Sequence, residues 1–164
     1  MRSLFIIFLL SVTVIPGISA QEVSVQELIS MVKYEHFSID TLMKKKGYRL
    51  MQKDIDSVSS QYYYSNLQRI ENGPSWVRAL SYVDLNLKDV SSRVLTYRTY
   101  NRDEYVKLLT AMLGIGYKTK ETFEFKDASH TIFTNGAQEI RVKTTNNKME
   151  DGRKVKTYEF ELGR

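Results

Sequence analysis

The clearest helical pattern in the sequence begins just after residue 100. Asn101 has the character of an N-cap residue, and Glu104 follows three positions later. Gly114 and Gly116 supply a stop signal, so the pattern predicts a helix between Asn101 and these glycines. Apolar side chains recur inside it at the spacing of one helix face, at Tyr105, Leu108, Leu109, Met112 and Leu113.

Two shorter helices are predicted nearer the start of the chain. Ser24 and Glu27 have the spacing of a capping box, in which each side chain accepts a hydrogen bond from the other residue's backbone. A second helix is expected from Ser38 to Lys46, because apolar residues share one face there and Gly47 ends the pattern.

Eight further segments are predicted to be short strands, because Val, Ile, Thr and aromatic residues gather in them between Gly, Asn, Asp and Ser. In the fifth of these segments apolar and polar residues alternate, with Tyr117, Thr119, Phe123 and Phe125 on one face, which is typical of a half-buried antiparallel strand. The elements together predict an α+β fold. The segments are Tyr48–Lys53, Ser60–Ser65, Trp76–Leu85, Arg93–Tyr100, Tyr117–Lys126, His130–Asn135, Gln138–Thr145 and Lys154–Leu162.

The second half of the chain is similar to the first when the two are laid over each other. The spacing between matched positions changes only in loops, which tolerate insertions. The sequence therefore predicts two pseudo-repeats in one compact unit, residues 21–100 and 101–164, each with an N-terminal helical element followed by a four-stranded antiparallel sheet. Whether the two sheets join is left open. The matches are Gly47-Tyr48 with Gly116-Tyr117, Tyr64 with Phe133, Val77-Arg78 with Ile140-Arg141, and Thr96-Tyr97 with Thr157-Tyr158.

The first 20 residues have the pattern of a secretory signal peptide. Arg2 is followed by an apolar stretch from Leu4 to Ile15 and by small residues up to Ala20. We therefore expect cleavage near Ala20 and export to the periplasm or beyond the cell. No second apolar run approaches the roughly 18 residues that span a bilayer, so no transmembrane span is expected in the mature chain.

Composition excludes several kinds of site. The 164 residues include no Cys, which excludes disulfides, cysteine-based zinc sites and thiol nucleophiles. The 24 Lys and Arg residues against 19 Asp and Glu give a net charge of +5, which permits an anionic partner without requiring one. The run Lys44-Lys45-Lys46 is interpreted as a solvent-facing helix end. Export argues against nucleic acid as the partner.

Residues suited to catalysis or metal binding are sparse. His36 and His130 are the two histidines, and neither has a second His at a metal-binding spacing. Asp40 follows His36 by four residues, but the helix is expected to begin between them, which argues against a shared face. The nucleophile pattern G-x-S-x-G is absent. Gly114-Ile115-Gly116 follows a helix, which favours a helix cap over a phosphate loop. We therefore assign no catalytic, cofactor-binding or metal-binding residue.

A sheet face in the first half is the best candidate for partner binding. If the repeat fixes the orientation, Val77, Ala79 and Val83 point inward, and Trp76, Arg78, Leu80 and Tyr82 point to the opposite side. Trp, Tyr and Arg are the residues enriched at interface hot spots. The alternative is that another part of the chain covers this face and makes it a second core. The predicted partner-binding residues are Trp76, Arg78, Tyr82, Arg98, Tyr100, Tyr62 and Tyr64.

The layout of two halves, each with a helical element and four antiparallel strands in an exported chain, resembles the β-lactamase inhibitory protein architecture. The stretches Ser24–Ile29 and Phe37–Tyr48 are also similar to those of small exported bacterial proteins of uncharacterised function. The resemblance implies a sheet surface that grips another protein. That inhibitor family relies on disulfides, which this chain cannot form, so inhibition of a β-lactamase is not carried over.

These observations favour a noncatalytic binding module that presents a sheet face to another envelope or extracellular protein or peptide. Two alternatives from other classes stay open. One is a small envelope hydrolase that uses His36 or His130. The other is a binder of anionic glycans or lipid head groups that uses lysine-rich edges.

Overall fold

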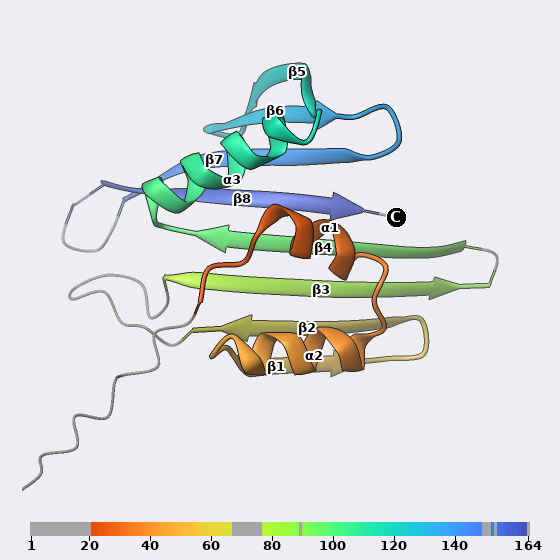
Figure 1. The fold of residues 1–164 in the computed structure, drawn as a ribbon. Helices are drawn as coiled ribbons and strands as arrows, with labels where there is room; N and C mark the ends of the chain where they lie inside the picture. Colours follow the sequence, from red (N-terminus) through yellow and green to blue (C-terminus); the bar gives the residue numbers. More distant parts are fainter. Residues whose placement is uncertain (1–20, 67–76, 89, 149–151, 153, 164) are drawn as a thin grey trace, which may run out of the picture.

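Three helices lie against one face of a single eight-stranded antiparallel sheet (Figure 1). This arrangement is seen in a computed structural model that describes residues 21–66, 77–88, 90–148, 152 and 154–163. The predicted α+β class is therefore confirmed. Within these ranges, none of the helices combines the length and the apolar character that crossing a bilayer requires.

All three predicted helices are present, as α1 (Val25–Met31), α2 (His36–Lys45) and α3 (Arg102–Gly114). Ser24 and Glu27 form the expected capping box at α1. Asn101 caps α3, because its side-chain oxygen accepts hydrogen bonds from the backbone N–H groups of Asp103 (2.9 Å) and Glu104 (3.1 Å). Helix α2 begins at His36, two residues before the predicted start.

Glycines end α2 and α3 in the same way. Gly47 and Gly116 adopt left-handed backbone conformations, with φ angles of 84° and 94°. Each is followed by a tyrosine whose backbone N–H reaches back to a helix carbonyl, Tyr48 to Met43 (2.9 Å) and Tyr117 to Met112 (3.1 Å). A residue with a Cβ adopts this conformation at a cost, which explains the glycine at both positions.

The eight predicted strands are all present and form one continuous sheet. Its spatial order is β1-β2-β3-β4-β8-β7-β6-β5. The antiparallel pair of β4 and β8 joins the first four strands to the last four, which answers the question that the sequence left open. The strands are β1 (Arg49–Ile55), β2 (Ser59–Ser65), β3 (Arg78–Leu87), β4 (Val90–Thr99), β5 (Lys118–Phe125), β6 (Ala128–Thr134), β7 (Glu139–Lys148) and β8 (Lys154–Gly163).

The edge strand β5 differs from its prediction. A β-bulge shifts its register between Thr119 and Glu121, so Thr119 lies opposite Phe133 but Glu121 lies opposite Ile132. Because neighbouring residues of β6 point to opposite faces, the bulge reverses the alternation along β5. Thr119 and Phe123 therefore lie on different faces, and every residue of the strand is exposed. The predicted half-buried strand with one apolar face is wrong.

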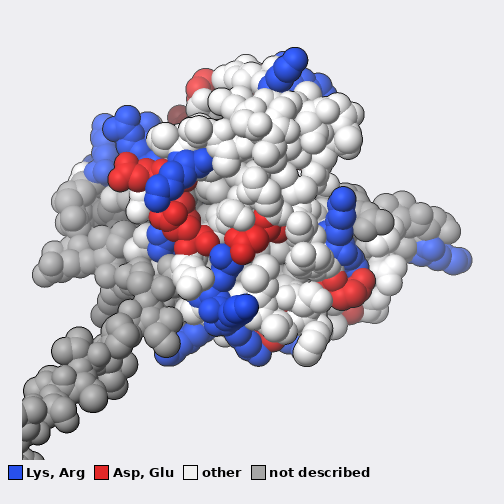
Figure 2. Space-filling model, viewed as in Figure 1, with Lys and Arg blue, Asp and Glu red and all other residues white. Residues whose placement is uncertain are grey.

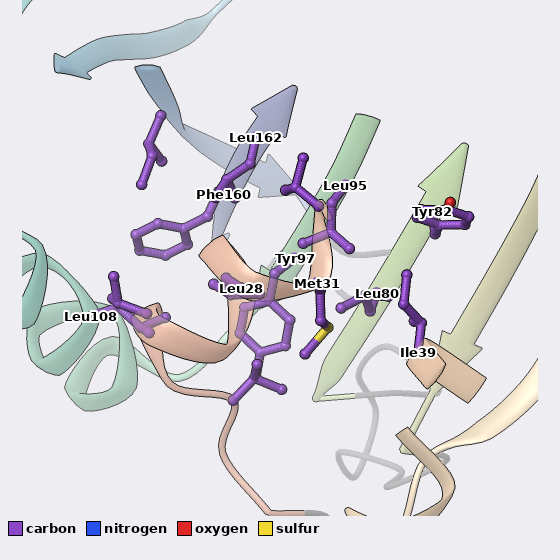
Figure 3. Packing of buried hydrophobic residues seen from close by; sticks show 14 of the residues in the cluster. Leu28, Met31, Ile39, Leu80, Tyr82, Leu95, Tyr97, Leu108, Phe160 and Leu162 are labelled. Atoms are coloured by element: carbon purple, nitrogen blue, oxygen red, sulfur yellow. The ribbon is translucent and has the colours of Figure 1, made fainter. Parts of the chain in front are cut away.

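The hydrophobic core lies between the helices and the central strands (Figure 3). Removing a large apolar side chain of this kind from water stabilises the fold by about 1.5–3 kcal/mol. The core therefore fixes which face of the sheet the helices cover. Its buried members include Leu28 and Met31 of α1, Ile39 of α2, Leu108 of α3, Leu80 and Tyr82 of β3, Leu95 and Tyr97 of β4, and Phe160 and Leu162 of β8.

A buried carboxylate, Glu104 in the first turn of α3, connects that helix to the sheet. Its side chain is 1% exposed. It accepts hydrogen bonds from Arg78 Nε (2.8 Å), Thr99 Oγ1 (2.8 Å) and the Tyr97 hydroxyl (2.5 Å). The Tyr97 hydroxyl also lies 3.2 Å from the Tyr48 hydroxyl. Burial raises the pKa of Tyr97, so its hydroxyl stays protonated and donates. We call these five residues the Glu104 network.

Replacing Glu104 with Ala is expected to lower the free energy of unfolding by about 3–5 kcal/mol, because the buried Arg78 loses its closer carboxylate and keeps the more distant one of Glu22, at 3.7 Å. Urea unfolding followed by circular dichroism measures the change. Glu121→Ala, on the exposed edge strand, serves as the control and should change stability by less than about 0.5 kcal/mol. Equal effects of the two substitutions would contradict a structural role for the network.

Candidate binding face

Strand pairing defines a sheet face that points away from the helices, which we call the open face. Side chains alternate along each strand, so residues next to the core members Leu80, Tyr97 and Phe160 point to this opposite side. Within the described residues, all three helices lie on the other face (Figure 1). Directly opposed residues form one line across the open face, the cross-strand row: Ser65, Ala79, Arg98, Glu159, Lys143, His130 and Phe123.

Ion pairs occupy the middle of the cross-strand row. Glu159 of β8 lies between two cations, with Arg98 Nε at 2.5 Å and Lys143 Nζ at 2.8 Å from its carboxylate oxygens. Burial acts to raise the pKa of Glu159, but the hydrogen bond from Lys143 and the charge of Arg98 outweigh it, so the pKa is lowered. Next to this group, Arg141 pairs with Glu161 at 3.2 Å. The middle of the open face thus displays both signs of charge in fixed positions.

Over strands β2, β3 and β4, the open face has large side chains next to small ones. Tyr63 lies opposite Ser81, which lies opposite Thr96. Burial raises the pKa of Tyr63, and the nearby Arg98 guanidinium opposes that rise. Tyr100 also lies close enough to act on Tyr63. This part of the open face thus combines the aromatic rings of Tyr63 and Tyr100, the guanidinium of Arg98 and the hydroxyls of the small residues Ser81 and Thr96.

Aromatic rings occupy the other end of the cross-strand row. Phe123 of β5 stacks on His130 of β6, with ring centroids 5.1 Å apart and an interplanar angle of 4°. Phe125 follows on the same side and is 55% exposed. Buried beneath this group, the His130 Nδ1 atom has no hydrogen-bond partner among the described residues. His130 is therefore packed by aromatic rings, and no hydrogen bond joins its ring to an acidic side chain among the described residues.

Four of the seven predicted partner-binding residues lie on the wrong face for that role. Tyr82 and Tyr64 are 0% exposed, and Arg78 and Tyr62 are 7% exposed. All four point toward the helices, where Arg78 belongs to the Glu104 network. The prediction that Arg78 and Tyr82 face away from the core is wrong, and the alternative of a covered face describes these side chains.

The other three predicted residues have different outcomes. Arg98 and Tyr100 lie on the open face, opposite in direction to Tyr97. Trp76 lies outside the described residues. Tyr63, which was not among the predicted partner-binding residues, lies beside Arg98. Its position between the two inward-facing tyrosines Tyr62 and Tyr64 is the signal that could have identified it.

A register error explains the reversed orientation of β3. The prediction matched Tyr64 with Phe133 and Val77 with Ile140. Because Phe133 lies opposite Ile140 in the structure, this match would place Tyr64 opposite Val77. Tyr64 instead lies opposite Leu80, three residues beyond Val77. An odd shift turns every side chain of a strand to the other face.

His36 and Asp40 form a small polar cluster that the sequence did not predict. Helix α2 begins at His36, so the two residues share a helix face four positions apart. His36 Nε2 lies 2.9 Å from the Tyr64 hydroxyl, which donates to Asp40 Oδ1 at 3.3 Å. The His36 ring also stacks on Tyr62, with centroids 3.5 Å apart. The cluster fastens the start of α2 to β2.

This cluster is poorly suited to catalysis. Tyr64 is fully buried, and burial raises the pKa of its hydroxyl well above the usual value, so it is no nucleophile at neutral pH. Asp40 is already paired with Lys44 Nζ at 2.7 Å. Across the described ranges, no three His, Asp or Glu side chains are grouped to hold a metal ion.

The lysine run at the end of α2 is only partly solvent-facing. Lys44 and Lys45 are exposed, as expected for a helix end. Lys46 is buried, where its Nζ donates to the Glu22 carbonyl at 2.9 Å and pairs with Glu27 at 2.9 Å. The interpretation of the whole run as a solvated face is therefore wrong for Lys46, which ties α2 to the capped start of α1.

The His36 cluster makes stability depend on pH. Burial lowers the pKa of His36, Asp40 acts to raise it, and Lys53 and Lys44 act to lower it, with a net decrease. The rings of Tyr62 and Tyr82 also face it. The unfolded chain therefore binds this proton more readily than the folded chain does. The contribution is complete above pH about 6.5 and is lost as the pH falls through the lowered folded-state pKa.

We expect the His36 ring to titrate below pH about 6.5 when its NMR signals are followed. His36→Gln should remove the matching loss of stability in this pH range, because glutamine does not titrate there. Carboxylates such as Glu159 lose their contribution at lower pH and leave a separate decrease in both proteins. A His36 pKa at or above the usual value would contradict the burial of its ring.

Comparison with known proteins adds no assignment to this description. The chain was compared with protein-family models, curated protein sequences and solved structures, and none of them matches it. The function therefore has to be inferred from the open face and its neighbouring side chains.

Proposed function

We propose that this protein is a noncatalytic binding module that presents its open face to another protein or peptide outside the cytoplasm. The observation that supports it best is the corner where Tyr63, Arg98 and Tyr100 meet. Tyr and Arg contribute most to interface hot spots, because they combine large contact area with directional polar groups. Export follows from the predicted signal peptide in residues 1–20.

The charges of the open face favour a protein partner over a small molecule. Glu159 and Glu161 alternate with Arg98, Lys143 and Arg141, so each of these five charges has a partner of opposite sign. A protein surface carries charges of both signs and can match such a pattern over a wide area, which supplies specificity. The small side chains beside Tyr63 leave space for a partner's larger side chain.

We also infer that the chain consists of two pseudo-repeats, residues 21–100 and 101–164. Three features at matched positions support this: the left-handed glycines Gly47 and Gly116, the buried tyrosines that follow them, and a bulge at the start of each edge strand. The first four strands and the last four then meet through the last strand of each set, β4 and β8. The inference explains how one scaffold carries two different surfaces, with Tyr63 beside small side chains in the first half and ion pairs beside the Phe123–His130 stack in the second.

The proposed function predicts that Ser81→Arg reduces partner binding by about tenfold or more, because a long cation then fills the space beside Tyr63. The matched control is Ser38→Arg, which makes the same change on the exposed surface of α2. Partners are captured from envelope extracts with each purified protein, and the affinity of a recovered partner is then measured for all three.

Unchanged urea unfolding would show that both variants are folded. Loss of binding in Ser81→Arg alone supports the open face as the binding surface. Equal recovery of the same proteins by both variants and the unchanged chain would reject it.

A further inference from the structure

A second surface, on the helix side of the sheet, has the chemistry of an anion site. A hollow of about 620 Å³ opens between the first turn of α3 and strands β6, β7 and β8. This size lies within the range of small-molecule pockets. The pairing of β4 with β8 places this hollow next to the Glu104 network, because its lining residue Tyr158 lies opposite Thr99 of that network. The lining residues are Arg102, Tyr105, Ser129, Thr144, Lys156 and Tyr158.

The charged residues of this pocket are all cations. Arg102 and Lys156 are exposed, and neither has a carboxylate partner among the described residues. The acid nearest in register is Glu124, which lies opposite Ser129 on the edge strand and outside the lining. On the open face, by contrast, Arg98, Lys143 and Arg141 are each paired with a glutamate.

The positive charge continues along the hairpin of β7 and β8. Lys148 lies directly opposite Lys154, on the same face as Lys156. Like charges in directly opposed positions destabilise a pair of strands, so this arrangement has an energetic cost. Figure 2 shows blue Lys and Arg atoms at the left of the view, on the side where α3 and β8 begin in Figure 1, with red Asp and Glu atoms beside them.

Hydroxyl groups complete the pocket. Tyr105 stacks on Tyr158, with ring centroids 4.0 Å apart, and the pair forms one wall. Burial raises the pKa of Tyr158 although Arg102 opposes this, so its hydroxyl stays protonated and can donate a hydrogen bond. Ser129 and Thr144 are directly opposed neighbours and add two more hydroxyls.

We propose that this pocket binds a phosphate monoester group. The Arg102 guanidinium offers a planar fork to phosphate oxygens, and Lys156 offers a second point charge. A monoester carries up to two negative charges at neutral pH, which suits two unpaired cations better than a single carboxylate does. The site lies on the opposite side of the sheet from the open face and is independent of the proposed protein partner.

The phosphate monoester has two possible sources, a free metabolite or the head group of a lipid. The pocket chemistry is the same for both, so the experiment uses one probe for each. Glycerol 3-phosphate is the soluble probe, with acetate and glycerol for comparison. Vesicles of phosphatidylcholine with phosphatidic acid are the lipid probe, with pure phosphatidylcholine vesicles for comparison.

Titration calorimetry and NMR of the full mature chain at low salt should show glycerol 3-phosphate binding about tenfold tighter than acetate, or binding to the phosphatidic acid vesicles. The double variant Arg102→Gln/Lys156→Gln should weaken either interaction by about tenfold or more. The control Lys33→Gln/Lys45→Gln removes the same charge from exposed positions far from the pocket and should change binding by less than about twofold. Ser81→Arg should bind the probes as the unchanged chain does.

Each outcome decides the proposal. Binding in either arm that depends on Arg102 and Lys156 supports it, and the arm identifies the source. No binding in both arms, acetate binding as tightly as glycerol 3-phosphate, or equal weakening in the two double variants would overturn it. Failure of the open-face experiment leaves this result unaffected, because the two sites share no residue.

Discussion

One buried carboxylate determines how the helices and the sheet fit together. A buried carboxyl group is costly unless it is hydrogen-bonded, and Arg78, Tyr97 and Thr99 all donate hydrogen bonds to Glu104. These partners come from β3 and β4, whereas Glu104 comes from α3. Because β4 also pairs with β8, the same contact holds the seam where the first four strands meet the last four.

This constraint also decides which sheet face is left for partners. With Arg78 directed to Glu104, strand alternation sends Leu80 and Tyr82 into the core and leaves Ala79 and Ser81 on the open face. Tyr82, the aromatic residue of β3, therefore packs in the core. The surface that remains is built mainly from small and charged side chains, and its exceptions are Tyr63, Tyr100 and the Phe123–His130 stack.

The two candidate surfaces differ in how their charges are balanced. On the open face, Glu159 satisfies both Arg98 and Lys143, so a partner gains by matching a fixed pattern of both signs. In the pocket beside α3, Arg102 and Lys156 lack such a carboxylate among the described residues, and an anion supplies the missing charge. The proposed protein-binding surface and the proposed anion site thus lie on opposite sides of a single sheet.

The sequence by itself determined the element types, because caps, glycine stops and β-rich segments act over a few residues. It located three helices and eight strands, with α2 starting two residues early and β5 misjudged at its bulge. The face of β3 and the pairing of His36 with Asp40 were decided only by the tertiary structure. A shift of the strand register by an odd number of residues turns every side chain to the other face. The register of β3 depends on its pairing with β2 and on the buried Arg78–Glu104 contact, and both join residues far apart in the sequence.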